Sequence, residues 1–211
     1  MPRAVPVSTF IEKLKLLESN PITTNSVLEV LHDFNVDDGS VRRFAAWSDE
    51  KYMRHLLYKD SLFEVILICW KPGQHTPVHT HNGQLGWATI TRGGLDVVNY
   101  QWHGCDRPEN QNVVGIDCLS GGKKVDIRAT GTVSASAGGP VATVTKQQSI
   151  HQILCPAGAV ENAASVHIYS LPIDSCVSFD LEHQRCGRRI LRYDTIDGQP
   201  NTAPIPVQPV Y

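Results

Sequence analysis

The sequence is poor in charge, and its 19 Lys and Arg are nearly balanced by 21 Asp and Glu among 211 residues. A chain without a basic excess lacks the electrostatic footprint of a nucleic-acid-binding protein. No run of 18 apolar residues is present, so no transmembrane helix is predicted. The first residues, Met1 to Pro6, lack the apolar core of a signal peptide. We therefore expect a cytoplasmic protein with no membrane or nucleic-acid partner.

Paired cysteine motifs are also missing. None of the 6 cysteines forms a C-x-x-C pair, so a structural zinc site is not predicted. In a cytoplasmic chain we expect the thiols to be reduced. Cys69 and Cys176 lie in apolar surroundings that are typical of small core residues. Cys105 and Cys118 lie in a turn-rich region, where the sequence leaves a disulfide open.

The residues that are frequent, Val, Ile and Thr together with 16 glycines and 13 prolines, favour a mainly β fold with many turns. The length suits a single domain over residues 1–211. Within it, residues 1–48 form a helical part, with helices expected over 8–17, 27–34 and 41–47. Ser8–Thr9 and Asn25–Ser26 are the predicted N-caps. Residues 195–211 form a Pro-rich tail, expected to extend along the surface.

Strand patterns begin at Tyr52. The expected strands cover residues 52–58, 62–70, 87–91, 95–102, 147–154, 164–170, 177–181 and 189–193. Between them, residues 103–146 are rich in Gly, Ser, Asn and Thr and carry only weak strand patterns, near 112–116, 124–129 and 141–145. Two interpretations of this excursion stay open: a solvated connection without function, or a flap over the functional site.

A pair of histidines follows the most apolar strand. The run Leu62 to Trp70 ends at a Pro72–Gly73 turn, and His79 and His81 come next. Because side chains two apart point to the same face of an extended strand, both imidazoles can reach one metal ion. The remaining histidines considered are expected to be non-ligands: His32, His55, His75, His103 and His183.

A second polar face lies on the segment 164–170. Ser165, His167 and Tyr169 share one face of this strand, and Val166 and Ile168 share the other. A half-buried strand of an open sheet would turn the polar face to solvent, whereas a small barrel with a polar interior would turn it inward. The alternation by itself does not choose between the two.

The stretch from Gly73 to Gly93 resembles the first cupin motif, G-x5-H-x-H-x3-4-E-x6-G, with His79 and His81 at the motif's spacing. This resemblance implies a mainly β, cupin-type small β-barrel, jelly-roll-like, with the N-terminal helices packed against it. The acidic position of the motif is occupied by Gly86. The loss of that carboxylate leaves two histidines and whatever ligand a later strand supplies.

Segments spread over about residues 50–180 resemble, in order, the cysteine dioxygenase family of thiol dioxygenases. They are Tyr52-x-Arg54, Cys69-Trp70-x-Pro72-Gly73 with His79-x-His81, Ile150-His151, and Ser165-x-His167-x-Tyr169-Ser170 followed by Pro172, Asp174 and Cys176. The resemblance implies that His79, His81 and His151 hold a non-haem Fe(II). It implies that Arg54 and Tyr52 bind the substrate carboxylate, and that Ser165, His167 and Tyr169 form a catalytic relay.

The implied chemistry suits three imidazoles. Neutral ligands leave positions open on one side of Fe(II) for substrate and O2, and the substrate thiolate supplies the missing negative charge. Transfer of both oxygen atoms to sulfur gives a sulfinic acid. In mammalian members, a cysteine at the position that matches Gly86 is cross-linked to the tyrosine. Gly86 therefore predicts an unmodified Tyr169, as in bacterial-type relatives.

The expected substrate is L-cysteine, oxidised to cysteine sulfinate, because some relatives with Gln in place of Arg54 act on 3-mercaptopropionate. The same chemistry on 3-mercaptopropionate, or on a bulkier carboxylated thiol such as ergothioneine, is an alternative. A hypothesis of another class is a non-catalytic cupin binding protein that keeps a metal only for structure. The expected partners are a small-molecule thiol and O2, and the expected assembly is a monomer or small homo-oligomer.

Overall fold

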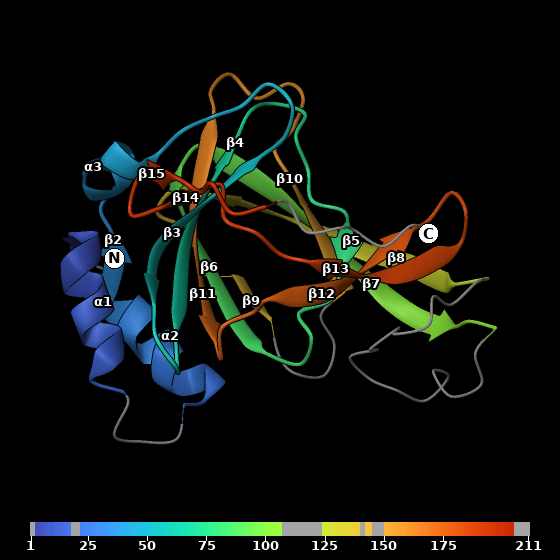
Figure 1. Cartoon of the computed structure of the whole chain (residues 1–211), viewed down its shortest axis with the longest axis horizontal. Helices are drawn as coiled ribbons and strands as arrows, with labels where there is room; N and C mark the ends of the chain where they lie inside the picture. Colours follow the sequence, from blue (N-terminus) through green and yellow to red (C-terminus); the bar gives the residue numbers. More distant parts are fainter. Residues whose placement is uncertain (1–2, 18–21, 107–123, 140–141, 145–149, 205–211) are drawn as a thin grey trace.

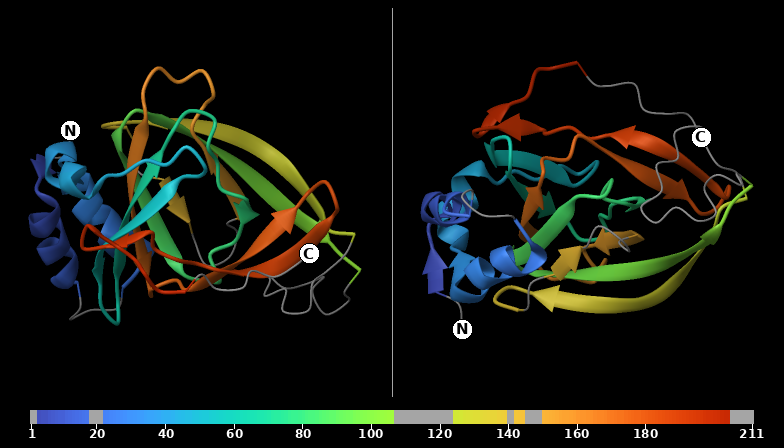
Figure 2. Two further views of the ribbon diagram at one scale, coloured as in Figure 1. Left: turned by 45° about the horizontal axis from the view of Figure 1, so that its top comes forward. Right: turned by 90° about the horizontal axis from the view of Figure 1, so that it is seen from below.

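Two facing sheets form a barrel, with helices at one side (Figure 1). The computed structural model describes residues 3–17, 22–106, 124–139, 142–144 and 150–204. Sheet I contains, in spatial order, β15 (Gln199–Pro200), β14 (Thr195–Ile196), β3 (Met53–Lys59), β4 (Glu64–Trp70), β11 (Ala163–Ser170), β6 (Leu85–Arg92) and β9 (Ala142–Val144). Sheet II contains β13 (Arg185–Ile190), β12 (Ser175–Asp180), β5 (Val78–His79), β10 (Ile150–Leu154), β7 (Gly94–Gly104) and β8 (Asp126–Ser136). The predicted cupin-type barrel is confirmed, and Figure 2 shows it from two further sides.

The central strands of sheet I are buried on both faces. Every residue of β4 is buried, because its alternate side chains enter two different cores. Val65 and Leu67 pack with the helices, whereas Ile66 and Ile68 pack inside the barrel against residues of sheet II. Burying each of these side chains stabilises the fold by roughly 1.5–3 kcal/mol. A continuous apolar run is what a strand with two covered faces requires.

The two cores on either side of sheet I also show which face of β11 points into the barrel. Val166 and Ile168 face outward and join the core beneath the helices. Ser165, His167 and Tyr169 face into the barrel, and all three are buried. The barrel interior therefore holds a row of polar side chains on one of its central strands.

The N-terminal helices cover the outer face of sheet I, as expected. They are α1 (Val7–Lys15), α2 (Thr24–Asp33), α3 (Asp38–Val41) and the 3-10 turn η1 (Arg42–Phe44), joined by a small parallel pair, β1 (Arg3–Val5) with β2 (Phe34–Val36). Phe10 and Leu14 of α1 and Val27 of α2 are fully buried between the helices and the sheet. Among the helices of the described ranges, none is long and apolar enough to cross a membrane.

The predicted caps of these helices are wrong. α1 begins at Val7, behind Pro6, so Ser8 and Thr9 lie inside it. α2 begins one turn early because the Thr23 side chain accepts a hydrogen bond from the backbone N–H of Ser26. The third helix, expected over 41–47, starts instead at Asp38, because the Asp37 side chain caps its N-terminus by accepting the backbone N–H of Ser40. The helical segment, including the 3-10 turn, ends at Phe44.

The excursion over residues 103–146 contains a long strand. β7 runs on to Gly104, and β8 pairs with it along its whole length. β9 returns to sheet I and pairs with β6. The expected strand near 112–116 lies outside the described residues. The described parts of the excursion, residues 103–106, 124–139 and 142–144, thus contribute strands to both sheets.

The region that follows β13 departs from the predicted tail. Residues 195–200 form the β14–β15 hairpin, and Thr195 of β14 pairs with His55 of β3. The Thr195 hydroxyl also bonds the buried His55 ring at 2.8 Å, which anchors this segment to sheet I. The last expected stretch, residues 205–211, lies outside the described residues.

The cysteines follow the prediction in part. Cys69, Cys105, Cys155 and Cys176 are free thiols, and Cys69 and Cys176 are buried as predicted. Cys186, in contrast, is disulfide-bonded, so the expectation of reduced cysteines is wrong at this position. Cys118 lies outside the described residues.

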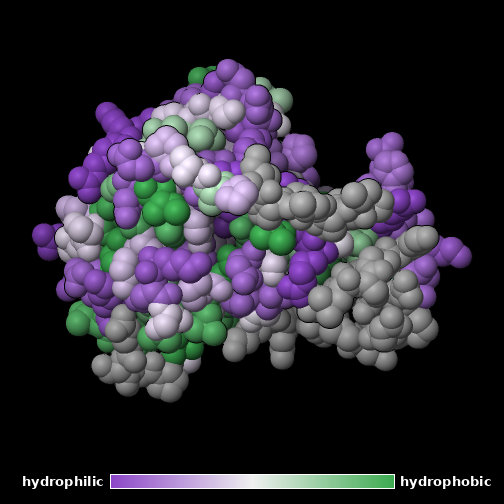
Figure 3. Space-filling model, in the orientation of Figure 1, coloured by the Kyte–Doolittle hydropathy of each residue, from purple (hydrophilic) through white to green (hydrophobic). Residues whose placement is uncertain are grey.

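The face shown in Figure 3 is mainly hydrophilic, with hydrophobic side chains exposed in small groups.

Candidate metal centre and substrate cavity

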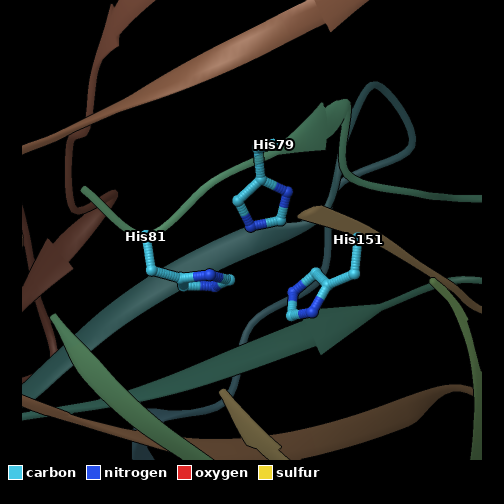
Figure 4. Close-up of side chains that lie close together, drawn as sticks. All are labelled: His79, His81 and His151. Atoms are coloured by element: carbon cyan, nitrogen blue, oxygen red, sulfur yellow. The ribbon is translucent and has the colours of Figure 1, made fainter. Parts of the chain in front are cut away.

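Three histidines converge inside the barrel. His79 on β5 and His151 on β10 are paired residues of sheet II, and His81 follows His79 by two positions. One ring nitrogen from each lies within 4.8 Å of the others, and the ring centroids are 4.6 to 5.0 Å apart. Figure 4 shows the three rings turned toward a common point. The structure therefore brings together the metal ligands that the sequence predicted.

The approach to His79 is shaped by its turn. Gly73 adopts a φ of +87°, which a residue with a side chain rarely adopts, and the chain then passes Pro77. The Nδ1–H of His79 donates to the carbonyl oxygen of Pro77 at 2.9 Å. This bond leaves Nε2 as the unprotonated nitrogen, available to a metal, and it holds the ring in place.

Burial keeps two of the three imidazoles neutral, which suits the binding of a cation. Burial lowers the pKa of His79 to about 4. Burial, reinforced by His81 and His79, holds the pKa of His151 well below its ordinary value. The Nε2 atom of His151 is buried without a hydrogen-bond partner among the described residues. An orphaned basic nitrogen in a cluster of neutral imidazoles fits a divalent transition metal that accepts nitrogen ligands.

Arg54 and Tyr52 line a small cavity beside this centre. This cavity, called the clamp cavity below, has a volume of about 30 Å³, whereas the neighbouring cavity described below has about 220 Å³. It is lined by Tyr52, Arg54, Ile68, Thr76, Pro77, His79, His81, Ile153, His167, Tyr169, Ile173, Cys176, Arg189 and Leu191. Tyr52 directly precedes β3, and its ring stacks on that of Trp70 with centroids 4.9 Å apart. The two predicted substrate-binding residues thus share one cavity with the metal ligands.

Arg54 is a buried cation with unused donors. Its side chain is 11% exposed, and its Nε and Nη2 atoms have no hydrogen-bond partner among the described residues. The nearest acid is Glu64, whose Oε1 is 4.0 Å from Nη2. Glu64 is fully buried, and its other oxygen accepts the backbone N–H of Ile173 at 2.7 Å. Because buried guanidinium groups are costly without partners, this geometry fits an incoming anion.

The predicted relay is hydrogen-bonded at its outer end. The Ser165 hydroxyl lies 2.8 Å from Nε2 of His167 and accepts the indole N–H of Trp70 at 3.0 Å. His167 and Tyr169 stack with ring centroids 6.4 Å apart, and the described hydrogen bonds do not join them. Burial lowers the pKa of His167 to about 3 and raises that of the Tyr169 phenol. Both groups are therefore neutral near pH 7, and the phenol keeps its proton.

A second, larger cavity touches the other side of the centre. This apolar chamber, about 220 Å³, is lined by His81, Gly86, Trp87, Ala88, Ile90, Leu95, Val97, Asn99, Val133, Ala135, Thr143, His151, Ile153, His167 and Tyr169. Val133 and Ala135 come from β8 and Thr143 from β9, so the 103–146 excursion supplies part of its wall. The flap interpretation stays a prediction.

Three residues near the clamp cavity were not predicted as site residues. Cys176 was expected only in the core, yet it also lines the cavity. Glu64 stands out in the sequence as a single acid within an apolar run, which signals a partnered buried charge. Arg189 lies on β13, and the expected strand over 189–193 starts too late to show which way its side chain points.

The histidines expected to be non-ligands lie outside the centre where they are described. His55 is buried and bonds Thr195 and the carbonyl oxygen of Ala46. His75 is exposed and lies 3.2 Å from the Gln152 side-chain nitrogen. His183 pairs with Asp180 at 2.7 Å on the surface.

Known proteins share this sequence pattern. The family model described as cysteine dioxygenase type I matches residues 2–182. Cysteine dioxygenase type 1 of Danio rerio is 22% identical over 174 residues, which cover 82% of this chain and 76% of that protein. The Homo sapiens protein of the same name is 21% identical over 176 residues, 83% of this chain and 77% of that protein.

Solved structures with some likeness include a RmlC-like cupin protein from Desulfovibrio desulfuricans. It has a TM-score of 0.41 and 17% identity, and the match covers 61% of this chain and 91% of that one. A Klebsiella pneumoniae protein with a double-stranded β-helix domain has a TM-score of 0.40 and 17% identity, over 63% of this chain and 87% of that one.

Proposed function

The chain belongs to the cysteine dioxygenase type I family, and from that membership we propose that it is an Fe(II)-dependent thiol dioxygenase acting on a thiol that carries a carboxylate. The observation that supports this most directly is the juxtaposition of two features. A cluster of three imidazoles without a carboxylate adjoins a cavity lined by a buried arginine, Arg54, two of whose nitrogens have no hydrogen-bond partner among the described residues.

His79, His81 and His151 would hold the iron, and the orphaned Nε2 of His151 supports this. When bound, Fe(II) would bring the substrate thiolate and O2 together, so that both oxygen atoms pass to sulfur and a thiolate becomes a sulfinate. The three protein ligands carry no charge, so the anionic thiolate is the ligand that this site lacks. An anion from the protein at the position of Gly86 would remove that need.

Arg54 would bind the substrate carboxylate. Its two unpartnered nitrogens, Nε and Nη2, offer the parallel N–H donors that a carboxylate accepts. Tyr52 contributes a neutral wall, because burial raises the pKa of its phenol. Carboxylate binding at Arg54 would orient the thiol toward the three histidines on the same cavity.

Tyr169 would act as a proton-bearing donor at the reacting centre. Its ring lies 6.0 Å from that of His81, centroid to centroid, and it lines both cavities. Since burial keeps the phenol protonated, its O–H can donate to an anionic group bound beside the histidines. His167, held by Ser165, would stack against the phenol and restrict its position. With Gly86 opposite, we propose that the phenol stays free of any thioether.

On the family resemblance alone, the substrate expected within this class is L-cysteine, with 3-mercaptopropionate and ergothioneine as alternatives. The test is anaerobic reconstitution with Fe(II), followed by O2 uptake and mass spectrometry of the products from a panel of carboxylated thiols. The proposal predicts a sulfinate and one O2 consumed for each thiol. An iron-loaded enzyme that forms no sulfinate from any of them would overturn it.

Arg54→Met tests the clamp directly. Loss of charge-assisted hydrogen bonds is expected to cost about 1.5–3 kcal/mol, or roughly 10- to 100-fold in kcat/KM. Arg54→Lys keeps the charge but not the fork of donors, so we expect only partial recovery. Thiols without a carboxylate provide the internal control, since their oxidation should not respond to either substitution.

A further inference from the structure

A second arginine faces the clamp cavity. Arg189 on β13 is the paired residue of Cys176 on β12, and paired residues of adjacent strands project to the same face of a sheet. Both side chains line the cavity together with Arg54. The preceding residue, Arg188, projects to the opposite face, where its Nη1 donates to the Ser175 hydroxyl at 2.7 Å.

The sheet register places Arg189 close to the metal centre. His151, His79 and Ser178 lie side by side across sheet II, and Ser178 pairs with Gly187 of β13. Arg189 is two residues from Gly187 and therefore shares the inward face of that row. The cationic side chain thus enters the cavity from sheet II, whereas Arg54 enters it from sheet I.

The charge of Arg189 has no acidic counterpart in the cavity. None of the described residues that line the cavity is Asp or Glu, and no described hydrogen bond or ion pair involves the Arg189 side chain. Glu64 lies beside Arg54, not among the lining residues. Burial raises the pKa of Cys176 to about 11, and Arg54, Arg189 and Arg188 act against that rise.

Two like charges that face one small cavity repel each other, and an anion between them relieves the repulsion. A monocarboxylate can satisfy Arg54 and leave the second guanidinium unmatched. An α-ammonium group would add a third positive charge in a cavity whose described lining offers it no carboxylate. A thiol with two acid groups matches both arginines, and because both side chains line one cavity the two acid groups must lie close together.

We propose that Arg189 is a specificity-determining residue that binds a second substrate carboxylate, and that the preferred substrate is a short thiol dicarboxylic acid such as 2-mercaptosuccinate. As far as oxidation is concerned, this rests on the proposed thiol dioxygenase function. The pairing of two carboxylates with two arginines does not depend on it.

The kinetic test compares 2-mercaptosuccinate, 3-mercaptopropionate and L-cysteine on the Fe(II)-loaded enzyme. The diacid is expected to show a kcat/KM at least about tenfold above the two monocarboxylates, as one charge-assisted contact implies. Arg189→Gln should remove that advantage by lowering kcat/KM for the diacid about tenfold relative to 3-mercaptopropionate. Arg188→Gln, the same change on the opposite face of the strand, should leave the preference intact.

A binding test without sulfur separates this inference from the proposed function. Succinate and propionate are titrated calorimetrically into the wild-type enzyme and the Arg189→Gln variant, both loaded with metal under anaerobic conditions. We expect succinate to bind the wild type more tightly than propionate, and the difference to disappear in the variant. If succinate behaves so while no thiol yields a sulfinate, the dioxygenase function fails and the diacid subsite stands. If thiols are oxidised but Arg189→Gln alters neither the diacid preference nor succinate binding, the subsite is refuted and the dioxygenase stands.

Discussion

Gly86 and Tyr169 are paired residues of β6 and β11, so the glycine lies directly across from the phenol-bearing residue inside the barrel. Gly86 also occupies the acidic position of the cupin motif and lines the apolar chamber. One missing side chain therefore has two effects. It places no carboxylate at this position beside the three histidines, and on our proposal it leaves the Tyr169 ring without a covalent partner.

Gly86→Cys is expected to restore such a partner. The new thiol would stand opposite the phenol across a pair of strands, at the separation where paired side chains meet. Incubation of the Fe(II)-loaded variant with substrate and O2 should give a product lighter by two hydrogens, detected by intact-protein mass spectrometry. The Gly86→Cys/Tyr169→Phe double variant should keep its full mass.

Glu64→Gln is expected to strengthen carboxylate binding. The substitution removes a negative charge 4.0 Å from Arg54 while the side-chain oxygen can still accept the N–H of Ile173. The KM for a carboxylated thiol should fall severalfold, and the ligand-free protein should lose about 1–3 kcal/mol, measured by denaturant unfolding, since a buried cation loses its nearest counter-charge. The exposed Glu161→Gln serves as the matched control, with neither value altered.

Ser165→Ala is expected to weaken both stability and turnover. Its hydroxyl serves Trp70 and His167 at once, so its removal leaves two buried nitrogens without a partner. The cost should be about 1–3 kcal/mol in the free energy of unfolding. The value of kcat should fall while iron content stays that of the wild type. Ser134→Ala, on an exposed part of β8, should have little effect on either.

Removal of the metal should destabilise the protein. A ligand present at 100 times its Kd stabilises the folded state by about 2.7 kcal/mol, and a domain of this size gains roughly 2–4 °C in Tm for each kcal/mol. A chelator should therefore lower the Tm of the iron-loaded enzyme by several degrees. His151→Ala should abolish both the bound iron and the chelator effect, whereas His75→Ala, an exposed histidine, should retain both.

The stability should fall in mild acid. Burial lowers the pKa of His55 in the folded protein, whereas its ordinary value is 6.5. The unfolded chain then binds a proton that the folded chain excludes, so His55 contributes stability that is present above pH 6.5 and is lost as the pH falls through the folded pKa. Thermal melts between pH 8 and pH 5 should show this decline. His55→Gln should flatten its upper part, near pH 6, and an unaltered profile would contradict the assignment to His55.

The sequence predicted the centre better than the segments around it. His79 and His81 could be paired because motif spacing and strand alternation are local rules, whereas His151 was assigned only by the resemblance of Ile150-His151 to a family segment. The barrel closes so as to bring the three together. The direction of the Ser165 face was beyond the sequence, since alternation is the same in an open sheet and a barrel. Only the helical layer on Val166 and Ile168 decides it.

The misplaced features depend on distant contacts or on competing local bonds. The cap of α2 passed to Thr23 because a reciprocal pair of bonds with Ser26 outweighs a single serine cap. The segment from residue 195 pairs with sheet I because Thr195 is hydrogen-bonded to His55, 140 residues earlier. Arg189 escaped notice because a half-buried arginine on a strand looks like any surface cation until its partner across the strand is known.

The two faces of β11 have a consequence for how such an enzyme can change. Ser165, His167 and Tyr169, the proposed catalytic residues, face the barrel interior, and Val166 and Ile168 rest on the helices. A shift of the helical layer therefore reaches Tyr169 through a single peptide unit. Substitutions at Val166 or Ile168 can therefore retune turnover while every cavity side chain stays the same. Adaptation to a new temperature or thiol could therefore occur by substitutions on the helix-facing side of β11, away from the cavity.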